Sequence, residues 1–324
     1  MNDVPDTLID FINTGGKFLV AGHKEPDGDC VGSQLGLCSL LKRIGKEAIP
    51  CSPGPFKRTE VKQYEDIFCL EPGEDIRKGA KVILCDCSSP ERTEGLTSFL
   101  KGLPLAIIDH HIHSGFPSEF KPDVSYIRQD ASSTTILVLY LMKAFGLTPT
   151  EEEAALLLLG LCTDTGFFRH SDTNSAETFE AAALLVRAGA NPKKAFHAMY
   201  GGKSLDSRYL IGQVLGRAES YFDGKLVIST EEYEETCRFG KDGRDSDALY
   251  QLFQTVKDIE AIVIIRQEKP DRCTVGLRSL DKVDVSSIAR SLGGGGHKNA
   301  AGISIMGTIP EVKEKLLIAF EEHF

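Results

Sequence analysis

The sequence predicts an α/β protein with an N-terminal parallel sheet and flanking helices, followed by a smaller α/β domain. In the first half of the chain, short apolar runs alternate with segments of helical length and spacing. Residues 81–86 and 105–109 are almost entirely apolar before a final aspartate, as expected for strands buried on both faces. The strand pattern restarts at Leu226 after a helical stretch. We therefore expect domains over 1–190 and 223–324, joined by a helical linker over 191–222.

The first strand and the turn after it carry the most informative motif. The strand is expected over residues 17–23, and Pro26 and Gly28 predict a turn directly after it. A helix over residues 30–44 follows, with Asp29 as its expected N-cap.

The other elements follow from the same signals. Residues 52–79 are rich in proline, glycine and charge and predict a loop with one short helix. Thr150 and Glu153 form a capping box that marks a helix start. Further helices are expected over 7–13, 131–145, 150–162, 174–188 and 285–292, and further strands over 47–51, 81–86, 105–109, 226–230, 261–266, 273–278 and 302–306. The acidic run over 231–235 is expected to be a solvated helix face.

Composition limits the classes of partner. The net charge of −10, from 37 basic and 47 acidic residues, argues against duplex DNA and anionic membranes as partners. A small anionic substrate stays open, because metal ions in one cleft can invert the local field. Nine cysteines without a C-x-x-C pair indicate a reducing compartment. With no signal-peptide pattern at the N-terminus and no apolar run of membrane length, we expect a cytoplasmic protein.

Several acidic and histidine side chains are expected at one edge of the parallel sheet. Ligands of such sheets gather beyond the carboxyl ends of the strands, where His23, Asp86 and His110 are predicted. Oxygen and imidazole ligands suit a hard or borderline divalent cation. The candidate metal ligands are His23, Asp27, Asp29, Asp86, His110 and Asp164. For the first turn alone, the alternative is a polar strand-to-helix turn with a capping aspartate.

Clustered carboxylates favour two cations over one. Four aspartates in one site repel one another unless cations lie among them. Two divalent ions would balance four negative charges, and two ions about 3.5 to 4 Å apart are the usual clamp for phosphoryl chemistry. Water or hydroxide bridging the ions could then attack phosphorus.

The motifs together resemble the DHH phosphoesterase superfamily, which includes RecJ exonucleases and family II inorganic pyrophosphatases. The resemblance covers residues 17 to about 170 and rests on four motifs: His23-x-x-x-Asp27-x-Asp29 with Gly32-Ser33, Asp86 at a strand end, Asp109-His110-His111, and Thr163-Asp164-Thr165-Gly166.

The resemblance also implies a role for each site residue. One ion would be held by His23 and Asp27, the other by Asp29 and His110, with Asp86 bridging the two and Asp164 completing the second set. Asp109 would orient His110, and His111 would face the scissile phosphate as a hydrogen-bond donor or acid. The implied cofactor is a pair of divalent ions, Mn²⁺ first, with Mg²⁺ or Co²⁺ as alternatives.

A glycine run marks the second domain. Residues 293–302 read GGGGHKNAAG and follow a helical pattern, so a dinucleotide-binding fingerprint, which should follow a strand, is excluded. Consecutive glycines let backbone N–H groups enclose an anion, with His297 as a further donor; the alternative is a tight helix-to-strand turn. Gly295, Gly296 and His297 resemble the GGGH signature of the DHHA1 domain, which in relatives closes over the metal centre and grips the nucleotide end of the substrate.

Two arginines complete the predicted substrate contacts. Arg278 and Ser279 lie in a segment that resembles the V-x-x-R-S stretch of the same domain, although an ordinary exposed strand arginine is the alternative. Arg169 follows Phe168 as in the F-R pair of many relatives.

The size of the chain resembles that of stand-alone DHH–DHHA1 proteins. These are nanoRNases that also dephosphorylate 3′-phosphoadenosine 5′-phosphate (pAp), or phosphodiesterases for cyclic di-AMP and its linear product pApA. The first hypothesis is a Mn²⁺-dependent phosphodiesterase for very short single-stranded oligonucleotides, with pAp as a further substrate and a cleft between the domains that limits substrate length. The alternative is cyclic di-AMP and pApA hydrolysis. A metal-dependent nucleotide sensor without turnover is disfavoured because every expected metal position is filled, and the oligomeric state stays open.

Overall fold

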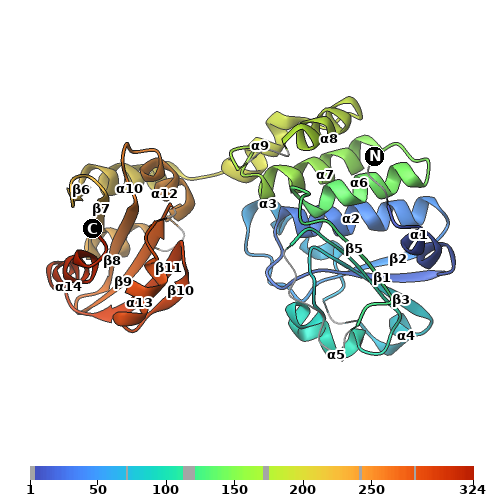
Figure 1. Ribbon diagram of the computed structural model, residues 1–324, viewed down its shortest axis with the longest axis horizontal. Coiled ribbons are helices and arrows are strands. Elements are labelled where there is room, and N and C mark those ends of the chain that lie inside the picture. Colours follow the sequence, from blue (N-terminus) through green and yellow to red (C-terminus); the bar gives the residue numbers. More distant parts are fainter. Residues whose placement is uncertain (1–3, 71, 112–120, 171–174, 241–242, 281) are drawn as a thin grey trace. The chain divides into compact units, whose positions relative to one another are not determined.

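The chain forms two compact units, Met1–Gly201 and Gly202–Phe324. The computed structural model describes residues 4–324 except 71, 112–120, 171–174, 241–242 and 281 (Figure 1). The unit boundary divides the segment predicted as a linker: α9 (Pro192–Tyr200) belongs to the first unit, and α10 (Leu205–Gly216) and β6 (Glu219–Tyr221) belong to the second.

The first unit is built on a five-stranded parallel sheet, which confirms the predicted fold class. The strands, in the spatial order β2-β1-β3-β4-β5, are Glu47–Cys51, Lys17–Ala21, Ala80–Cys85, Leu105–Asp109 and Val124–Ile127. β5 was not predicted, because its four residues lie at the sheet edge and only Tyr126 among them is buried.

Helices cover both faces of this sheet. The main core lies on one face, beneath α1 (Asp6–Asn13), α2 (Gly28–Arg43), α6 (Thr134–Ala144) and α7 (Glu151–Asp164), and includes Phe18, Leu37, Ile83 and Leu157. The other face buries Leu19, Val82 and Ile107 together with residues of η2 (Pro90–Leu96) and α5 (Thr97–Leu100). Figure 1 shows α2, α6 and α7 on one side of the sheet and α4 and α5 on the other. The remaining helices of this unit are α3 (Thr59–Lys62), η1 (Glu65–Ile67), α4 (Glu74–Arg77) and α8 (Ser175–Arg187).

The start of α2 differs from the prediction in a way that shapes the site. The helix begins at Gly28, two residues earlier than expected, so the N-cap is Asp27, whose carboxylate accepts from the backbone N–H groups of Asp29 and Cys30. Asp29 is therefore not the cap of its own helix. Its buried carboxylate instead accepts from the N–H groups of Thr134 and Thr135, at 2.6 and 2.9 Å, in the first turn of α6.

The predicted capping box of α7 is present. The Thr150 hydroxyl accepts from the N–H of Glu153, and the Glu153 carboxylate accepts from the N–H of Thr150. The helix extends two residues beyond its predicted end, so Asp164 lies in its last turn.

The second unit is a six-stranded mixed sheet with helices on both faces. Its order is β10-β11-β9-β8-β7-β6, and of these neighbours only β7 and β8 run parallel. The strands besides β6 are β7 (Leu226–Glu231), β8 (Ala261–Lys269), β9 (Arg272–Ser279), β10 (Gly295–His297) and β11 (Ala300–Met306), and the helices besides α10 are α11 (Tyr233–Phe239), α12 (Ser246–Gln254), α13 (Val285–Ser291) and α14 (Ile309–Glu321).

The expectation of a solvated acidic face over 231–235 is wrong at two positions. Glu231 is buried at the end of β7, where its carboxylate contacts Arg244 at 2.6 Å and Arg266 at 3.2 Å. Glu235 is also buried and pairs with Arg217. Arginines from distant segments therefore neutralise charges that the local sequence pattern places in water.

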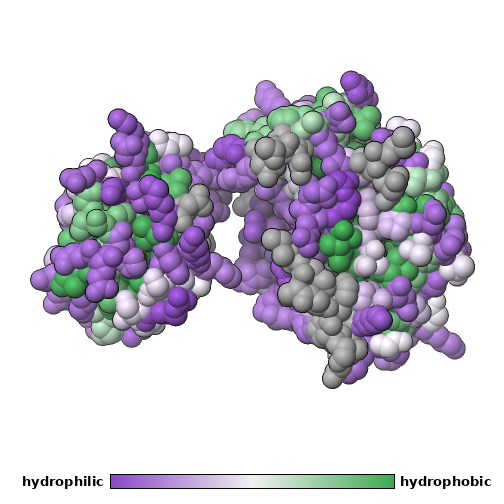
Figure 2. All heavy atoms as spheres, in the orientation of Figure 1, coloured by the Kyte–Doolittle hydropathy of each residue, from purple (hydrophilic) through white to green (hydrophobic). Residues whose placement is uncertain are grey.

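Most hydrophobic side chains lie in the cores. Figure 2 shows mainly hydrophilic side chains on the visible face of both units. Large exposed apolar residues of the described part of the chain include Phe179, Phe196 and Tyr209. Among the described residues, no helix combines the length and apolar character needed to span a membrane.

Candidate active site

The six predicted metal ligands come together at one edge of the parallel sheet. Asp86 and His110 directly follow β3 and β4, and His23 lies two residues after the end of β1; the carboxyl ends of these strands meet at this edge. The first turn of α2 adds Asp27 and Asp29, and the last turn of α7 adds Asp164.

Asp86 lies between the two histidines. One carboxylate oxygen, Oδ2, lies 3.4 Å from Nε2 of His23, and the other, Oδ1, lies 3.6 Å from Nε2 of His110. Asp27 lies on the His23 side, with Oδ1 at 3.9 Å from Nε2 of that ring. Asp29 and Asp164 lie on the His110 side, with carboxylate oxygens 3.9 and 2.9 Å from its Nε2. Asp86 is thus the central carboxylate between two groups of ligands.

The backbone of Asp86 is held in an unusual conformation. Its φ of 57° is in the left-handed region, which aspartate adopts more readily than most residues. Its N–H donates to the carbonyl of Ile108 at 3.0 Å, so the turn after β3 is fixed to β4. The Thr134 hydroxyl donates to Oδ1 at 3.4 Å. These bonds keep the carboxylate aimed between the histidines.

Both histidines present Nε2 to the carboxylates. Nδ1 of His23 lies 2.7 Å from the Lys24 carbonyl, and Nδ1 of His110 lies 3.2 Å from the Ala131 carbonyl. Since a carbonyl can only accept, Nδ1 carries the proton, and Nε2 of a neutral ring offers its lone pair. Nε2 of His110 is buried and makes no hydrogen bond of acceptable geometry with any described residue, although Asp164 is near. Lone pairs and carboxylates that face one another in this way fit a cation.

The charges of the cluster lead to the same conclusion. Burial, together with repulsion from Asp164 and Asp86, raises the pKa of Asp29 well above its ordinary value. Burial also raises the pKa of Asp86 to about 6, although its hydrogen bond with His23 opposes the shift. Burial disfavours the charged form of His110, but Asp164 and Asp29 raise its pKa to about 10. Without a cation, this site must therefore take up protons to balance its negative charge.

In the ligand group formed by His23 and Asp27, by contrast, the contact between the two side chains favours the charged form of each. Burial disfavours the charged forms of both His23 and Asp27, but their mutual contact outweighs it and lowers the pKa of Asp27 to about 2. Cys30, Asp27 and Asp86 together raise the pKa of His23 above its ordinary value. A bound metal ion would replace the proton on His23.

Asp109 and His111 form a separate pair beside these ligands. Asp109 is buried and accepts from the backbone N–H groups of His110 and His111 and from Nδ1 of the His111 ring, at 2.8 Å. The resemblance implied that Asp109 orients the ring of His110, but the ring that it holds belongs to His111. This hydrogen bond raises the pKa of His111, which is half-buried.

Three groups of side chains in the described part of the chain have ligand atoms within 4.8 Å of one another: His23, Cys30 and Asp86; Asp86, His110 and His111; and Asp29, His110 and Asp164. Cys30 was not predicted. The one feature of the sequence that could have marked Cys30 as a candidate ligand is its position directly after Asp29. The donor types fit a divalent metal ion.

The predicted substrate contacts of the second unit lie partly together. His297 on β10 is opposite Ala300 on β11, and Ala300 is opposite Arg278 on β9. Residues that are opposite in antiparallel strands share a face of the sheet, so the structure brings Arg278 and His297 onto one face. The Arg278 guanidinium lies over the Tyr250 ring, 4.6 Å from its centroid.

The glycine run ends in a strand that needs glycine. Gly295 and Gly296 pair with β11 and are exposed, as is His297. Gly296 has a φ of 147°, and a Cβ atom there would lie 2.4 Å from the Ala300 carbonyl oxygen. Ser279 is buried, and its hydroxyl donates to the Lys298 carbonyl at 3.4 Å, so it stabilises the turn between β10 and β11.

Arg169 lies in the first unit, where its side chain is already engaged. Nε donates to the Gly166 carbonyl at 3.0 Å, and Nη2 donates to the Tyr200 hydroxyl at 3.1 Å. Among the residues that the structure describes, its guanidinium makes no other hydrogen bond.

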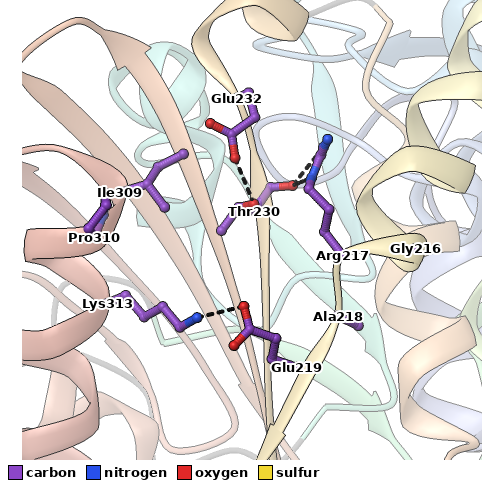
Figure 3. A pocket seen from close by; sticks show the side chains of 9 residues that line it. All are labelled: Gly216, Arg217, Ala218, Glu219, Thr230, Glu232, Ile309, Pro310 and Lys313. Carbon is purple, nitrogen blue, oxygen red and sulfur yellow. Dashed lines mark hydrogen bonds and ion pairs between the residues drawn. The ribbon is translucent and has the colours of Figure 1, made fainter.

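A cavity of about 480 Å³ in the second unit contains none of these residues (Figure 3). Both basic side chains that line it are already engaged: Lys313 contacts Glu219 at 2.7 Å, and Arg217 donates to the Thr230 carbonyl and to Glu235. An anionic ligand would have to break these pairs, so the metal-ligand cluster is the candidate active site.

Comparisons with known proteins identify the family. The DHH family N-terminal domain matches residues 17–161, and the DHHA1 domain matches residues 223–324. A bifunctional oligoribonuclease and PAP phosphatase of Thermus thermophilus is 31% identical over 309 residues, which are 95% of this chain and 90% of that protein. This chain belongs to the DHH family. As a DHH phosphoesterase, it is a hydrolase of phosphate esters.

Two further proteins are similar to this chain. The cyclic-di-AMP phosphodiesterase PdeA of Listeria monocytogenes is 25% identical over an alignment of 343 positions, which covers 99% of this chain and 50% of the Listeria protein. The crystal structure of an exopolyphosphatase-related protein from Bacteroides fragilis has a TM-score of 0.80 at 24% identity, over 98% of this chain and 95% of that one. This last likeness confirms the fold.

Proposed function

We propose that this DHH protein is a phosphodiesterase that hydrolyses very short single-stranded oligonucleotides, with pAp as a further substrate. The observation that carries the proposal is the position of Asp86 between His23 and His110, which offers one carboxylate to two groups of ligands. The similarity to the Thermus oligoribonuclease and PAP phosphatase over 95% of the chain supports the substrate class.

We also propose that the cofactor is a pair of divalent ions, Mn²⁺ by preference. When bound, the ions would activate water for attack on phosphorus and stabilise the charge that develops in the transition state. His23 and Asp27 would hold one ion, Asp29, His110 and Asp164 would hold the other, and Asp86 would contact both. In the metal-free site, burial and the neighbouring carboxylates raise the pKa of Asp29, and the pKa of His110 is raised to about 10, so protons occupy the site in place of cations.

His111 is the proposed proton or hydrogen-bond donor. Its Nδ1 donates to Asp109, its Nε2 makes no hydrogen bond with a residue that the structure describes, and the half-buried ring stays accessible from solvent. Asp109 favours the protonated form, which can donate to a phosphate oxygen or to the leaving oxygen. Asp109 is therefore a positioning residue for His111.

The second unit would bind the nucleotide. We propose that residues 1–190 carry the chemistry, that residues 191–222 link the domains, and that residues 223–324 hold the substrate through Arg278, Ser279, Gly295, Gly296 and His297, with Arg169 as a contact from the first unit. The shared sheet face of Arg278 and His297 supports this role. The nine free cysteines support action in a reducing compartment, the cytoplasm.

A second candidate function is cyclic di-AMP or pApA hydrolysis. It is favoured by the similarity to the Listeria phosphodiesterase, although the chain spans only half of that protein.

Parallel hydrolysis assays test the proposal. Protein stripped with a chelator is assayed with pApA, a five-nucleotide RNA, pAp and cyclic di-AMP, with and without added Mn²⁺. We expect Mn²⁺-dependent release of AMP from the short RNAs, abolished by Asp86→Ala and retained in Asp66→Asn, whose side chain is exposed in η1. Faster turnover of cyclic di-AMP would favour the second candidate. Tight nucleotide binding without turnover of any substrate would overturn the proposed activity in favour of a sensor.

A further inference from the structure

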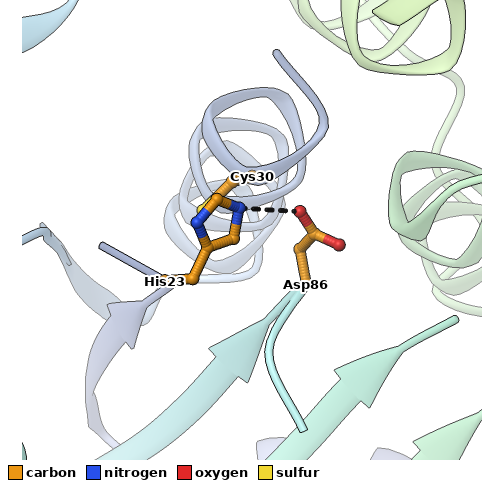
Figure 4. A group of neighbouring side chains, drawn as sticks. All are labelled: His23, Cys30 and Asp86. Atoms are coloured by element: carbon orange, nitrogen blue, oxygen red, sulfur yellow. Dashed lines mark ion pairs between the residues drawn. The ribbon is translucent and has the colours of Figure 1, made fainter. Parts of the chain in front are cut away.

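Cys30 is a metal-binding type of residue inside the candidate active site with no role in the chemistry described so far. It lies in the first turn of α2, directly after Asp29, and is completely buried. Its Sγ atom lies within 4.8 Å of ligand atoms of both His23 and Asp86. Figure 4 shows the three side chains converging from the end of β1, the start of α2 and the end of β3.

The local backbone makes room for the sulfur beside His23. A Cβ atom on Gly22 would lie 2.3 Å from Sγ of Cys30, so any larger residue at position 22 would push the thiol away. On its other side the thiol donates to Oε1 of Gln34, at 3.4 Å. Gln34 is itself fixed, because its Nε2 donates to the carbonyls of Val20 and Cys51 at 2.9 Å. The sulfur is therefore held between a fixed amide and the imidazole of His23.

The neighbouring ligands have the spacing of a metal site. Nε2 of His23 and Oδ2 of Asp86 are 3.4 Å apart. Two ligands on one tetrahedral ion, with bonds of about 2.0 to 2.1 Å, are separated by about 3.3 Å. The Sγ atom of Cys30 is a third donor, of a different chemical type, within 4.8 Å of ligand atoms of His23 and Asp86.

We propose that Cys30 is a further ligand of the ion held by His23 and Asp86 and binds it through Sγ. The inference rests on the proposed metal centre and refines it. A metal–sulfur bond forms, the S–H bond breaks, and the proton leaves to solvent. Because sulfur is a softer donor than a carboxylate, this position then favours Co²⁺, Zn²⁺ or Fe²⁺ over Mn²⁺, while the ion beside Asp29, His110 and Asp164 keeps an oxygen and nitrogen set.

Substitution with Co²⁺ shows directly whether a cysteine sulfur binds the metal ion. Full-length protein is stripped with a chelator and titrated with Co²⁺, and its absorption spectrum is recorded. A cobalt–thiolate bond gives a charge-transfer band in the near ultraviolet, whereas oxygen and nitrogen ligands give only the weaker visible bands. We expect the near-ultraviolet band in the natural protein and its complete loss in Cys30→Ser and Cys30→Ala. The serine variant keeps a hydroxyl donor for Gln34, which guards against loss of the fold.

Two other cysteines serve as matched controls. Cys38 lies two turns further along α2, is buried in the hydrophobic core and belongs to none of the ligand groups found among the described residues. Cys87 is next to Asp86, but its thiol donates to the Ser89 carbonyl at 3.0 Å. The band should persist in Cys38→Ala and Cys87→Ala.

Each of the other outcomes overturns the inference in a different way. Bound Co²⁺ with visible bands but no charge-transfer band would leave the proposed function intact and show that Cys30 is not a ligand. Loss of the band in Cys87→Ala with retention in Cys30→Ser would assign the sulfur to Cys87. Failure of the natural protein to bind Co²⁺ would overturn the proposed metal centre together with this inference.

Discussion

At the scale of single residues, the site depends on which nitrogen of each histidine is free. The Lys24 and Ala131 carbonyls fix Nδ1 of His23 and His110, so both rings turn Nε2 toward Asp86. In His111 the buried Asp109 carboxylate fixes Nδ1. Backbone carbonyls thus prepare two histidines as ligands, whereas a carboxylate prepares the third as a donor of protons or hydrogen bonds.

His111→Asn tests this division of roles. If His111 donates to the substrate, its loss should lower kcat by about 10²- to 10⁴-fold, while the metal content of the protein stays unchanged. Hydrolysis of an ester with a good leaving group, such as bis(p-nitrophenyl) phosphate, should fall less, because that oxygen needs no proton. Steady-state kinetics on both substrates and elemental analysis give the answer. The control is His323→Asn, at an exposed position near the C-terminus. A loss of bound metal in His111→Asn would show instead that His111 is a ligand.

Metal binding should tighten as the pH rises. In the metal-free protein the pKa is about 6 for Asp86 and about 10 for His110, so at neutral pH the site carries protons that an ion must displace. Raising the pH removes these protons and lowers the cost of binding. Calorimetric titrations with Mn²⁺ between pH 6 and 8, in two buffers of different ionisation enthalpy, should show proton release and a rising affinity. An affinity independent of pH would contradict this electrostatic description.

The six candidate ligands could be selected from the sequence because each lies at a strand or helix end marked by local signals. The same signals could not reveal three contacts. Asp29 meets the first turn of α6, more than a hundred positions later in the chain. Asp109 selects the His111 ring through its rotamer, and Cys30 reaches His23 only because Gly22 leaves space. Spacing predicts which residues gather, whereas packing decides which atoms touch.

At the scale of elements, strand β7 shows how charges become part of a core. Glu231, at its end, contacts Arg244 and Arg266, and Arg244 also contacts Glu268 at 2.8 Å. The run of acidic residues in the sequence gave no sign of this, because the arginines come from a later loop and from the neighbouring strand. A strand such as β5, with one buried residue among four, likewise shows no pattern in the sequence.

Glu231→Gln should destabilise the second unit. Removing the charge leaves two partly buried arginines without their shared partner, which costs about 3 to 5 kcal/mol in the free energy of unfolding. Urea denaturation followed by circular dichroism measures the loss, and hydrogen exchange of residues 226–231 and 261–269 assigns it to this unit. Glu234→Gln, at an exposed position of the same acidic run, should change stability by no more than about 0.5 kcal/mol. Equal effects of the two substitutions would contradict a buried network.

At the scale of the whole molecule, the two units carry different chemistry. The first has the acidic metal-ligand cluster, which repels an anionic substrate until cations are bound. The second has the arginine, histidine and glycine backbone that suit a phosphate. This division follows the sequence closely, because both the DHH and the DHHA1 signatures are local motifs. Under the proposed function, a chain with a net charge of −10 would rely on these few positive groups to hold a nucleotide.

Arg278→Ala tests whether binding and chemistry are separate in this way. If the guanidinium grips a phosphate or base of the substrate, its loss removes a charged hydrogen bond of about 1.5 to 3 kcal/mol, or roughly 10- to 150-fold in KM for a short RNA. Hydrolysis of bis(p-nitrophenyl) phosphate, which has no nucleotide to bind, should be unchanged, and so should the metal content. Arg272→Ala on the same strand is the control, because that side chain is exposed at the other end of β9. An equal loss on both substrates would mean that Arg278 supports the chemistry itself, and an unchanged KM for RNA would place the nucleotide contacts elsewhere in the chain.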